Sequence, residues 1–500
     1  MLFVSFTFRI LLFMYIKLSY CEQYNLYGDA GQAYALEIYI GSPPQKLNVL
    51  VDTGSTTLAI ASYSRKDSDK YFHLENSTSL FNSEKEVQAK YSQGTWIGRL
   101  VSDLVKFPSL PSIPEVRCDV ALITKSHKFF MNGSGWQGLL GLAYLPVGAW
   151  GENVVVGSWL DSVEHAMNRP MSFQLNLCGT ESSTNATHYG RLEMLDDRAK
   201  HEAQMFRTPI LRKRWYEIGV LSVRLLNLSK SESLSNATGD EDNNVTKTQG
   251  MTVNPSVQDI DKDMCLKLNE EKSILDSGTT NIRMPDLLFR QVVDQLRNAA
   301  QTSNMLILDD FWYRGEAACW PEPQEWSLPW LAIDLLSAEV DNQYFTLEIP
   351  PQNFMRVVTA RLNSRESGTL SEFCYKLGLE AGGKETVLGY TAMEGLEILF
   401  NRSASWISWK PSDCGPKARV SGPYNASSSL LTMCQLTQPV PDVAVSIKAA
   451  QWTLCVISII AGAVLLYLLA PCIKMFLVKP LPRSQQISLS QAALVETENA

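Results

Sequence analysis

Apolar and polar residues alternate along residues 33–51, which is the period of a half-buried β-strand. The alternating apolar positions are Tyr34, Leu36, Ile38 and Ile40 before the sequence GSPPQ, and Leu47, Val49 and Val51 after it. Gly and Pro in GSPPQ favour a turn, so the segment indicates two strands joined by a short connection. Most of the chain up to residue 200 continues with short alternating runs broken by Gly, Ser, Asn and Pro. The pattern predicts a mainly β fold.

One segment of the body has the period of an amphipathic helix. It is PDLLFRQVVDQLRNAA, which begins at Pro285 and places Leu288, Val292, Leu296 and Ala299 on one face. We expect it to be the only strong helix before the C-terminal apolar segment. Residues 228–260 are polar and nearly free of aromatics, which predicts a solvated surface loop. After residue 415 the chain is rich in Ser, Asn and Pro and predicts a stalk.

A long uncharged segment lies near the C-terminus. Trp452 to Ala470 contains no charged residue, and with its uncharged flanks it is long enough to cross a bilayer as a helix. A buried helix of a globular domain is the alternative, but so long an apolar surface favours a membrane span. Lys474, Lys479 and Arg483 follow the segment, whereas only Lys448 closely precedes it. This asymmetry predicts a cytoplasmic tail.

The N-terminus also carries an apolar segment. Residues 1–20 precede small and polar residues, as in a secretory signal, although Arg9 and Lys17 interrupt the apolar run. We favour a cleaved signal over an uncleaved anchor. Together with the predicted tail, this places the body of the chain in the lumen or outside the cell.

Sequons and cysteines agree with that placement. The N-x-S/T sequons all precede the span and begin at Asn76, Asn132, Asn185, Asn227, Asn236, Asn244, Asn401 and Asn425. The body contains an odd number of cysteines unless Cys21 survives signal cleavage, and in an oxidising compartment most should pair. No Cys-x-x-Cys or His-rich spacing predicts a metal site. The net charge of −8 argues against a nucleic-acid partner.

The segment LVDTGSTTL at 50–58 runs an apolar strand into Asp52. A buried carboxylate is costly unless it is hydrogen-bonded or neutralised, although Asp-Thr-Gly alone is also ordinary turn chemistry. A second copy, SILDSGTT at 273–280, ends a strand at Asp276. Each copy is followed by two apolar residues and a glycine, in GLLGLAY at 138–144 and VLGYT at 387–391. The repetition indicates a duplicated lobe, with the aspartates meeting on a pseudo-twofold axis.

Two neighbouring carboxylates cannot both ionise easily, so they share a proton and titrate as a pair. The ionised one can act as general base toward a water, and the protonated one can donate to a carbonyl oxygen. Such a pair adds water to an amide without a covalent intermediate. The flanking residues support the pair: Gly54 and Gly278 admit backbone N–H groups, Ser55 and Thr279 bond the outer oxygens, and Thr53 and Ser277 bond across to the opposite loop.

With these motifs the sequence resembles the pepsin-like aspartic proteases over nearly all of residues 30–415. Long segments are similar to the beta-secretase branch of that family: YSQGTWIGRLVSDLV at 91–105, KFFMNGSGWQGLLGLAY at 128–144, SILDSGTTNIRMP at 273–285 and AMEG at 392–395. The resemblance implies a bilobal fold of two pseudo-symmetric β-lobes and no cofactor. The predicted C-terminal span agrees with the beta-secretase branch.

By the resemblance, Tyr91 is the flap tyrosine that closes over substrate. Digestive members brace it with a tryptophan at the position of Ala59, whereas the secretases use one on the flap, which Trp96 matches. The alternative for Trp96 is a cross-strand packing residue. The resemblance also implies that Gly94 lets the flap tip turn and that Gln93 and Thr95 contact substrate.

Other expected roles are less sharply defined. Trp136, Leu50 and Phe129 match residues of the non-prime pocket, although each is equally plausible as core. Arg212, in TPILRKRW, is the best match to family arginines that read acidic substrate side chains. The family disulfides carry over to Cys178–Cys414, Cys265–Cys434 and Cys319–Cys374, which leaves Cys118 as a buried free thiol.

The sequence departs from the family in three places. Only a short stretch separates the predicted signal cleavage from the first strand, so we expect little or no proteolytic activation. The 228–260 loop is longer than the family's and could alter access to one end of the cleft. The tail lacks the acidic-dileucine signal typical of beta-secretase, which leaves cell surface and endosome open as locations.

We therefore expect a type I membrane-anchored aspartic endopeptidase that cuts extended, membrane-proximal polypeptides at mildly acidic pH as a monomeric catalytic unit. The rivals are a catalytically silent pepsin-fold receptor and a carboxylate-pair glycosidase. Both triplets are intact, which argues against the first, and the duplicated lobe argues against the second. The expected segments are a signal peptide (1–21), an N-terminal lobe (22–200), a C-terminal lobe (201–415), a stalk (416–448), a membrane helix (449–473) and a cytoplasmic tail (474–500).

Overall fold

The computed structural model describes residues 24–29, 31–65, 70–91, 94–130, 135–144, 156–180, 186–196, 206–226, 260–303, 307–361, 372–436 and 443–477. The expected signal peptide and most of the 228–260 loop and of the expected tail lie outside these residues. The chain forms two compact units, Met1–Thr437 and Gln438–Ala500, which we describe separately.

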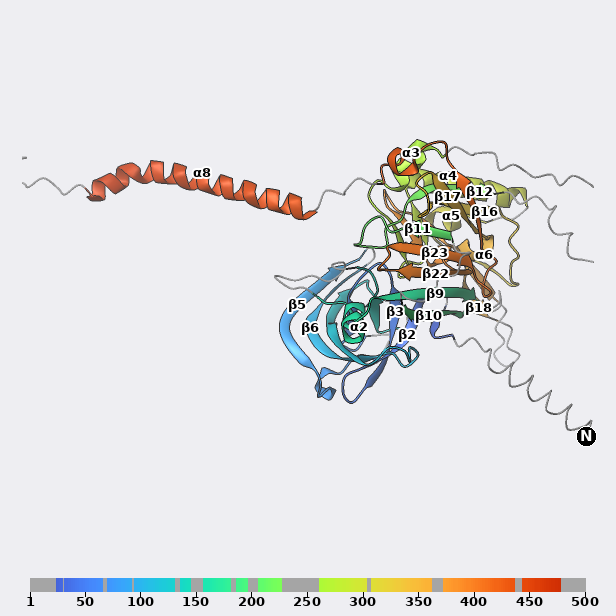
Figure 1. The fold of residues 1–500 in the computed structure, drawn as a ribbon, viewed down its shortest axis with the longest axis horizontal. Helices are drawn as coiled ribbons and strands as arrows, with labels where there is room; N and C mark the ends of the chain where they lie inside the picture. Colours follow the sequence, from blue (N-terminus) through green and yellow to red (C-terminus); the bar gives the residue numbers. More distant parts are fainter. Residues whose placement is uncertain are drawn as a thin grey trace, which may run out of the picture. The chain divides into compact units, whose positions relative to one another are not determined.

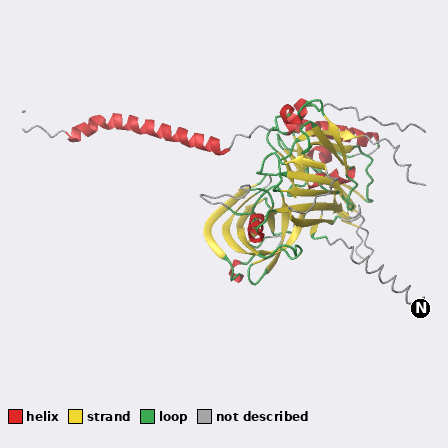
Figure 2. Cartoon of the chain, viewed as in Figure 1, coloured by secondary structure: helices red, strands yellow, loops and turns green. Residues whose placement is uncertain are grey.

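Strands dominate the first unit, as the alternating pattern predicts (Figure 2). The strands are β1 (Leu26–Asp29), β2 (Gln32–Ile40), β3 (Gln45–Asp52), β4 (Leu58–Ala61), β5 (Phe81–Lys90), β6 (Thr95–Lys106), β7 (Val116–His127), β8 (Gly138–Gly141), β9 (Met171–Thr180), β10 (His188–Asp196), β11 (Phe206–Pro209), β12 (Val220–Leu226), β13 (Ser273–Asp276), β14 (Ile282–Met284), β15 (Ala318–Trp320), β16 (Trp330–Leu336), β17 (Gln343–Ile349), β18 (Met355–Arg361), β19 (Glu372–Leu377), β20 (Leu379–Ala381), β21 (Thr386–Gly389), β22 (Leu396–Asn401), β23 (Trp406–Pro411) and β24 (Arg419–Asn425).

The helices of the first unit are short except for one. They are η1 (Leu74–Asn76), α2 (Trp159–Met167), α3 (Lys262–Leu268), α4 (Asp286–Thr302), α5 (Asp309–Arg314), α6 (Pro351–Phe354), η3 (Tyr390–Ala392) and α7 (Leu430–Met433). Helix α4 buries the predicted face, including Leu288, Val292 and Leu296. The prediction of a single strong helix was wrong, because α2 and α3 are also helices of this unit. Each is less than three turns long, so its apolar residues repeat too few times for the helical period to be detected in the sequence.

A large sheet connects the two halves of the first unit. Its strand order is β11-β23-β22-β9-β10-β1-β2-β3-β8-β4-β7-β6-β5, so strands from the end of the domain pair with strands from its beginning. Figure 1 shows β9, β22 and β23 side by side between the curved strands β5 and β6 and the elements of the second half. Strands β2 and β3 form the expected hairpin, with Ile38 opposite Leu47.

The duplication predicted from the two triplets is present in the strand pairing. β3 runs parallel to β8 with Asp52 opposite Gly141, and β13 runs parallel to β21 with Asp276 opposite Gly389. In each half a further strand, β4 or β14, pairs antiparallel with that same partner. The two apolar-apolar-Gly segments are therefore the strands that hold the two aspartate strands in place.

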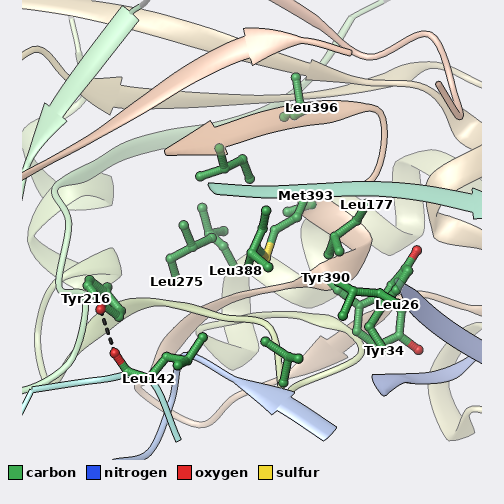
Figure 3. Packing of buried hydrophobic residues seen from close by; sticks show 14 of the residues in the cluster. Leu26, Tyr34, Leu142, Leu177, Tyr216, Leu275, Leu388, Tyr390, Met393 and Leu396 are labelled. Carbon is green, nitrogen blue, oxygen red and sulfur yellow. Dashed lines mark hydrogen bonds between the residues drawn. The ribbon is translucent and has the colours of Figure 1, made fainter. Parts of the chain in front are cut away.

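The core of the first unit is continuous across both halves. Buried side chains from the N-terminal half, such as Tyr34 and Leu142, belong to one cluster with Leu275, Leu388 and Met393 from the C-terminal half. Figure 3 shows part of this cluster, including Leu142, Leu275 and Leu388. Packing across the halves fixes their relative position, because a dense core resists sliding.

The predicted boundary of the C-terminal lobe was wrong. Strand β24, within the expected stalk, pairs with β17 of the lobe, and the fold continues through α7. The disulfide Cys265–Cys434 ties this segment to α3, with an S–S distance of 2.06 Å. The Ser- and Pro-rich composition concealed an edge strand, where Pro is tolerated. Disulfides Cys178–Cys414 and Cys319–Cys374 are also formed, as the resemblance implies.

The second unit contains helix α8 (Val443–Leu477), the longest helix that the structure describes. Within it, Trp452–Ala470 is apolar and exposed, and it is long enough to cross a membrane. Among the described residues, no other helix meets that criterion of length and composition.

Candidate active site

The two aspartates meet because each ends a buried strand of its own half. Asp52 is the last residue of β3 and Asp276 is the last residue of β13. Behind each, the partner strand supplies a close-packed glycine. A Cβ on Gly141 would lie 2.4 Å from the carbonyl carbon of Thr56, and one on Gly389 would lie 2.4 Å from the carbonyl oxygen of Asn281. Both positions therefore admit only glycine, which explains the repeated apolar-apolar-Gly segments.

The two aspartate loops hold each other through a reciprocal set of hydrogen bonds. Thr53 Oγ1 accepts from the backbone N of Ser277 at 2.9 Å and donates to Leu275 O at 2.9 Å. Ser277 Oγ accepts from the backbone N of Thr53 at 3.1 Å and donates to Val51 O at 2.8 Å. Both side chains are fully buried, so every one of these bonds is shielded from water.

Each carboxylate is held by its own loop in the same way. Gly54 N donates to Asp52 Oδ1 at 2.8 Å, and Gly278 N donates to Asp276 Oδ1 at 2.9 Å. The second oxygens accept from hydroxyls: Ser55 Oγ donates to Asp52 Oδ2, and Thr279 Oγ1 donates to Asp276 Oδ2 at 2.6 Å. The arrangement is the one that the sequence predicts for these six supporting residues.

The carboxylates face each other across the two glycines. A Cβ on Gly54 would lie 2.5 Å from Asp276 Cγ, and a Cβ on Gly278 would lie 2.4 Å from Asp52 Oδ1. Any side chain at either glycine would therefore displace the opposite carboxylate. This contact shows that the two aspartates form one pair.

The environment of Asp52 favours its protonated form. Its side chain is only 5% exposed, and burial raises its pKa well above the usual range. The neighbouring Asp276 raises this pKa further, while the bonds from Ser55 and Gly54 oppose the rise. Asp276 is partly exposed at the end of β13. Asp52 therefore keeps its proton over a pH range in which an isolated aspartate would be ionised.

A hairpin of β5 and β6 carries the expected flap residues. Tyr91 N donates to Gly94 O at 2.8 Å, which closes the hairpin. Gly94 packs tightly, because a Cβ there would lie 2.5 Å from Lys128 O. Thr95 is exposed at the start of β6 and pairs with Lys90 and His127. Gln93 lies outside the described residues.

With this geometry established, the comparisons with known proteins agree on one family. The family model described as "Eukaryotic aspartyl protease" matches residues 33–242. A "Beta-secretase" of Strongylocentrotus purpuratus is 29% identical over 434 residues, which cover 82% of this chain and 72% of that protein. In both comparisons the chain is similar to pepsin-like aspartyl proteases.

More distant members match over shorter segments. A "Chymosin" of Callithrix jacchus is 33% identical over 115 residues, which cover 22% of this chain and 29% of that protein. A "Vacuolar protease A" of Aspergillus fumigatus is 23% identical over 198 residues, covering 38% of this chain and 47% of that protein. Among these relatives, the similarity to the beta-secretase extends over most of both chains.

Tyr91 lies near the two aspartates. Burial raises the pKa of its phenol and the nearby Asp52 adds to the rise, whereas Trp96 and Ser55 oppose it. Trp96 is 1% exposed on β6, beside the tyrosine. Neither Tyr91 Oη nor Trp96 Nε1 makes a hydrogen bond of normal geometry to the described residues. The structure therefore places the two side chains together but does not join them by a hydrogen bond.

The residues expected to line the non-prime pocket cluster beside the flap. Leu50, Trp96 and Trp136 are buried in one cluster, against which Tyr91 and Phe129 pack. The rings of Tyr91 and Phe129 lie 5.3 Å apart, and those of Phe129 and Trp136 lie 5.9 Å apart. Aromatic packing thus connects the flap tyrosine to Phe129 and, through it, to Trp136.

The contacts of Arg212 differ from the expected role. Its Nε donates to Glu217 Oε2, and Glu217 is only 4% exposed. Burial raises the pKa of Glu217, while the Arg212 guanidinium opposes the rise. An arginine occupied in compensating a buried carboxylate is less available to read a substrate. The uncertain register of TPILRKRW is the reason that the sequence could not distinguish these roles.

The described sequons differ in exposure. Asn76 and Asn425 are exposed. Asn401 is 3% exposed, and its Oδ1 accepts from Ser403 Oγ at 3.3 Å and from Ala404 N at 2.8 Å. The expectation of a glycan at Asn401 is therefore incompatible with the folded domain. The other five sequons, at Asn132, Asn185, Asn227, Asn236 and Asn244, lie outside the described residues.

Cys118 is a buried free thiol on β7. Burial raises its pKa, and the nearby Asp119 and Asp103 raise it further. Such a thiol is largely protonated and inaccessible at neutral pH, which argues for a packing role.

Proposed function

We propose that the chain is an aspartic endopeptidase that hydrolyses peptide bonds of extended polypeptides through Asp52 and Asp276. The observation that carries the proposal is the facing pair of carboxylates, each within contact of the opposite loop's glycine. A water between them can be deprotonated by the ionised carboxylate while the protonated one donates to the scissile carbonyl. The shared proton sets the working range at mildly acidic pH.

The flap supports the choice of an extended peptide as substrate. Thr95 is exposed at the start of β6, next to the tip of the hairpin. A peptide lying beneath the flap in extended form would pair its backbone with such edges and direct alternate side chains into pockets. Leu50, Phe129 and Trp136 offer an apolar wall on one side of the flap tyrosine.

The apolar part of α8 supports a membrane anchor. We infer a type I topology with the folded domain in the lumen or outside the cell, a tail in the cytoplasm, and passage through the secretory pathway to the surface or endosomes. An enzyme held beside anchored substrates benefits from a high effective concentration. Membrane-proximal segments of other proteins are therefore the proposed substrates, and the folded unit is proposed to act as a monomer.

The proposal is tested with the full chain in detergent micelles and a peptide library at pH 4–6. We expect cleavage that a statine-type inhibitor abolishes and that is absent from an Asp276→Asn variant. Asp196→Asn is the matched control, because this half-buried carboxylate pairs with Arg169 at 2.7 Å and belongs to neither aspartate loop. A folded wild-type protein without inhibitor-sensitive cleavage would favour a silent binding protein instead.

A further inference from the structure

Tyr216 is linked by hydrogen bonds to both aspartate strands, directly to β13 and through Leu142 to the end of β3. Its backbone O accepts from Leu275 N at 3.1 Å, and Leu275 directly precedes Asp276. Its phenol donates to Leu142 O at 2.6 Å (Figure 3). Leu142 N in turn donates to the backbone O of Asp52 at 2.8 Å. One buried tyrosine is thus linked to the backbone of both catalytic strands.

Arg402 fixes the same junction from the other side. Its NH1 donates to Leu142 O at 3.0 Å, to Ala143 O at 3.2 Å and to the Tyr216 hydroxyl at 3.2 Å. Ala143 N donates to Ser55 O at 2.8 Å, so the 142–143 segment bonds the Asp52 loop through its N–H groups. Its carbonyls are bound by Tyr216 and Arg402, which leaves the segment little freedom to move.

The guanidinium of Arg402 is itself held in place. It is 7% exposed and lies 3.5 Å from Asp161 and 3.8 Å from Glu164, both on helix α2. Its Cζ lies 4.6 Å from the ring centre of Tyr144. A buried cation needs such partners, and Arg offers several donors in a fixed plane. Arg402 follows β22 of the second half, so it connects both halves at the back of the dyad.

We propose that Tyr216 and Arg402 are positioning residues that set the distance and orientation of the Asp52 and Asp276 carboxylates. The inference rests on the proposed protease function of that pair. Cross-loop bonds from Thr53 and Ser277 join the loop tips, whereas Tyr216 and Arg402 fix the strands from which the loops project. Catalytic groups need such support, because a displacement of about 1 Å can cost about a hundredfold in rate.

Removal of the Tyr216 hydroxyl alone tests the alignment of the two carboxylates without disturbing the fold. In Tyr216→Phe the ring keeps its contacts with Tyr144, Phe173 and Phe400, whose centres lie 4.7 to 5.9 Å away. Leu142 O still accepts from Arg402. The variant is therefore expected to fold and to lose only the two hydrogen bonds of the hydroxyl, the one donated to Leu142 O and the one accepted from Arg402. Tyr375→Phe is the matched control, since that buried hydroxyl accepts from Gln324 N at 2.9 Å and bonds neither aspartate loop.

The experiment compares the full-length wild type, Tyr216→Phe, Arg402→Lys and Tyr375→Phe in detergent. We expect kcat to fall about tenfold in Tyr216→Phe and Arg402→Lys with KM within twofold, and the apparent pKa values of kcat/KM to move. Tyr375→Phe should match the wild type in both. Calorimetry with a statine-type inhibitor, whose hydroxyl binds between the carboxylates, reports the same alignment without turnover and should show about tenfold weaker binding to Tyr216→Phe.

Each outcome decides between the two claims. If the wild type cleaves peptide and Tyr216→Phe equals Tyr375→Phe in kcat and pH profile, the positioning role is overturned while the protease function stands. If the wild type binds inhibitor but cleaves nothing, the protease proposal fails and the inhibitor affinities alone decide the role of Tyr216. A folded wild type that neither cleaves nor binds inhibitor contradicts both, since both require an aligned pair.

Discussion

Thr53 and Ser277 exchange hydrogen bonds across the two aspartate loops, with each backbone N donating to the other's side-chain oxygen at 3.1 and 2.9 Å. Their hydroxyls then donate to Leu275 O and Val51 O. Thr53 directly follows Asp52, and Ser277 directly follows Asp276. The relationship makes the two loops mutually dependent, because the loss of either hydroxyl leaves a backbone donor and a backbone acceptor of the opposite half unsatisfied.

Thr53→Val should therefore destabilise the domain as well as inactivate it. The change keeps the shape but removes the acceptor for Ser277 N and the donor to Leu275 O. An unsatisfied buried group costs about 1–3 kcal/mol, so urea unfolding should shift by that amount or more. Thr302→Val, at the exposed end of α4, is the control and should change stability by less than about 0.5 kcal/mol. Equal stability of the two variants would contradict the account.

Gly278→Ala should abolish cleavage. The added Cβ would lie 2.4 Å from Asp52 Oδ1, so one carboxylate must move out of the pair. We expect a loss of at least about a hundredfold in kcat/KM, the cost of a misplaced catalytic group. Gly135→Ala is the control, since nothing lies within 4 Å of its added methyl. Retention of full activity by Gly278→Ala would show that the carboxylates are not in contact through this loop.

Asp52 should make the domain less stable as pH rises. The pKa of Asp52 in the folded state is raised above its ordinary value of 3.8, so between these two pKa values the folded state keeps a proton that the unfolded state has lost. Stability from this group is complete below the unfolded pKa and is lost as pH rises through the folded one. Asp52→Asn should lose less stability than wild type between pH 4 and pH 7. The free energy of unfolding in urea at several pH values measures the difference, and parallel curves would contradict the shift.

Glu394 should contribute in the same direction at a defined pH. It accepts from the Tyr34 hydroxyl at 2.7 Å, and burial raises its pKa from 4.5 to about 7. The stability that Glu394 contributes is complete below pH 4.5 and is lost as pH rises to about 7. The free energy of unfolding should fall by roughly 3 kcal/mol over this range, because one pKa unit corresponds to about 1.4 kcal/mol. Glu394→Gln should therefore be more stable than wild type at pH 8 and similar at pH 4.

The neighbouring His188 acts in the opposite direction, because burial lowers its pKa to about 4. It is unchanged in Glu394→Gln, so its effect cancels when the variant is compared with wild type at each pH. A stability difference that does not vary with pH would show that Glu394 titrates normally.

The variant Trp96→Phe distinguishes two roles of Trp96, bracing of the flap Tyr91 and packing between strands. The indole Nε1 makes no hydrogen bond of normal geometry to the described residues, so Phe preserves most of the buried contact. If substrate brings Tyr91 Oη within reach of Trp96 Nε1, the variant should lose several-fold in kcat/KM with a small change in thermal stability. A change in stability alone, with kcat/KM retained, would assign Trp96 to packing.

The sequence predicted the parts of the site that are repeated in the chain. The triplets at Asp52 and Asp276, and the segments ending in Gly141 and Gly389, occur twice, so their pairing in space followed from symmetry. Tyr216 and Arg402 have no counterpart in such a repeat. They contact the dyad loops only through the tertiary fold, and a lone buried Tyr or Arg has no distinguishing sequence pattern.

Other failures have equally local causes. The stalk was expected from composition, but Arg419–Asn425 forms an edge strand that pairs antiparallel with β17. The Cys265–Cys434 pairing implied by the resemblance already required residue 434 to lie against the lobe. Asn401 matches a sequon, yet the strand that ends there buries its side chain. Burial of this kind depends on packing partners distant in sequence, which a short motif does not contain.

The central claim is that Asp52 and Asp276 act together on a peptide bond. The most direct measurement is kcat/KM for one cleaved peptide with full-length wild type, Asp52→Asn and Asp276→Asn at pH 4–6. The account predicts that each substitution alone lowers kcat/KM by about a thousandfold or more, as expected when a general acid or base is removed, while circular dichroism shows a folded protein. Substantial cleavage by either folded variant would contradict it.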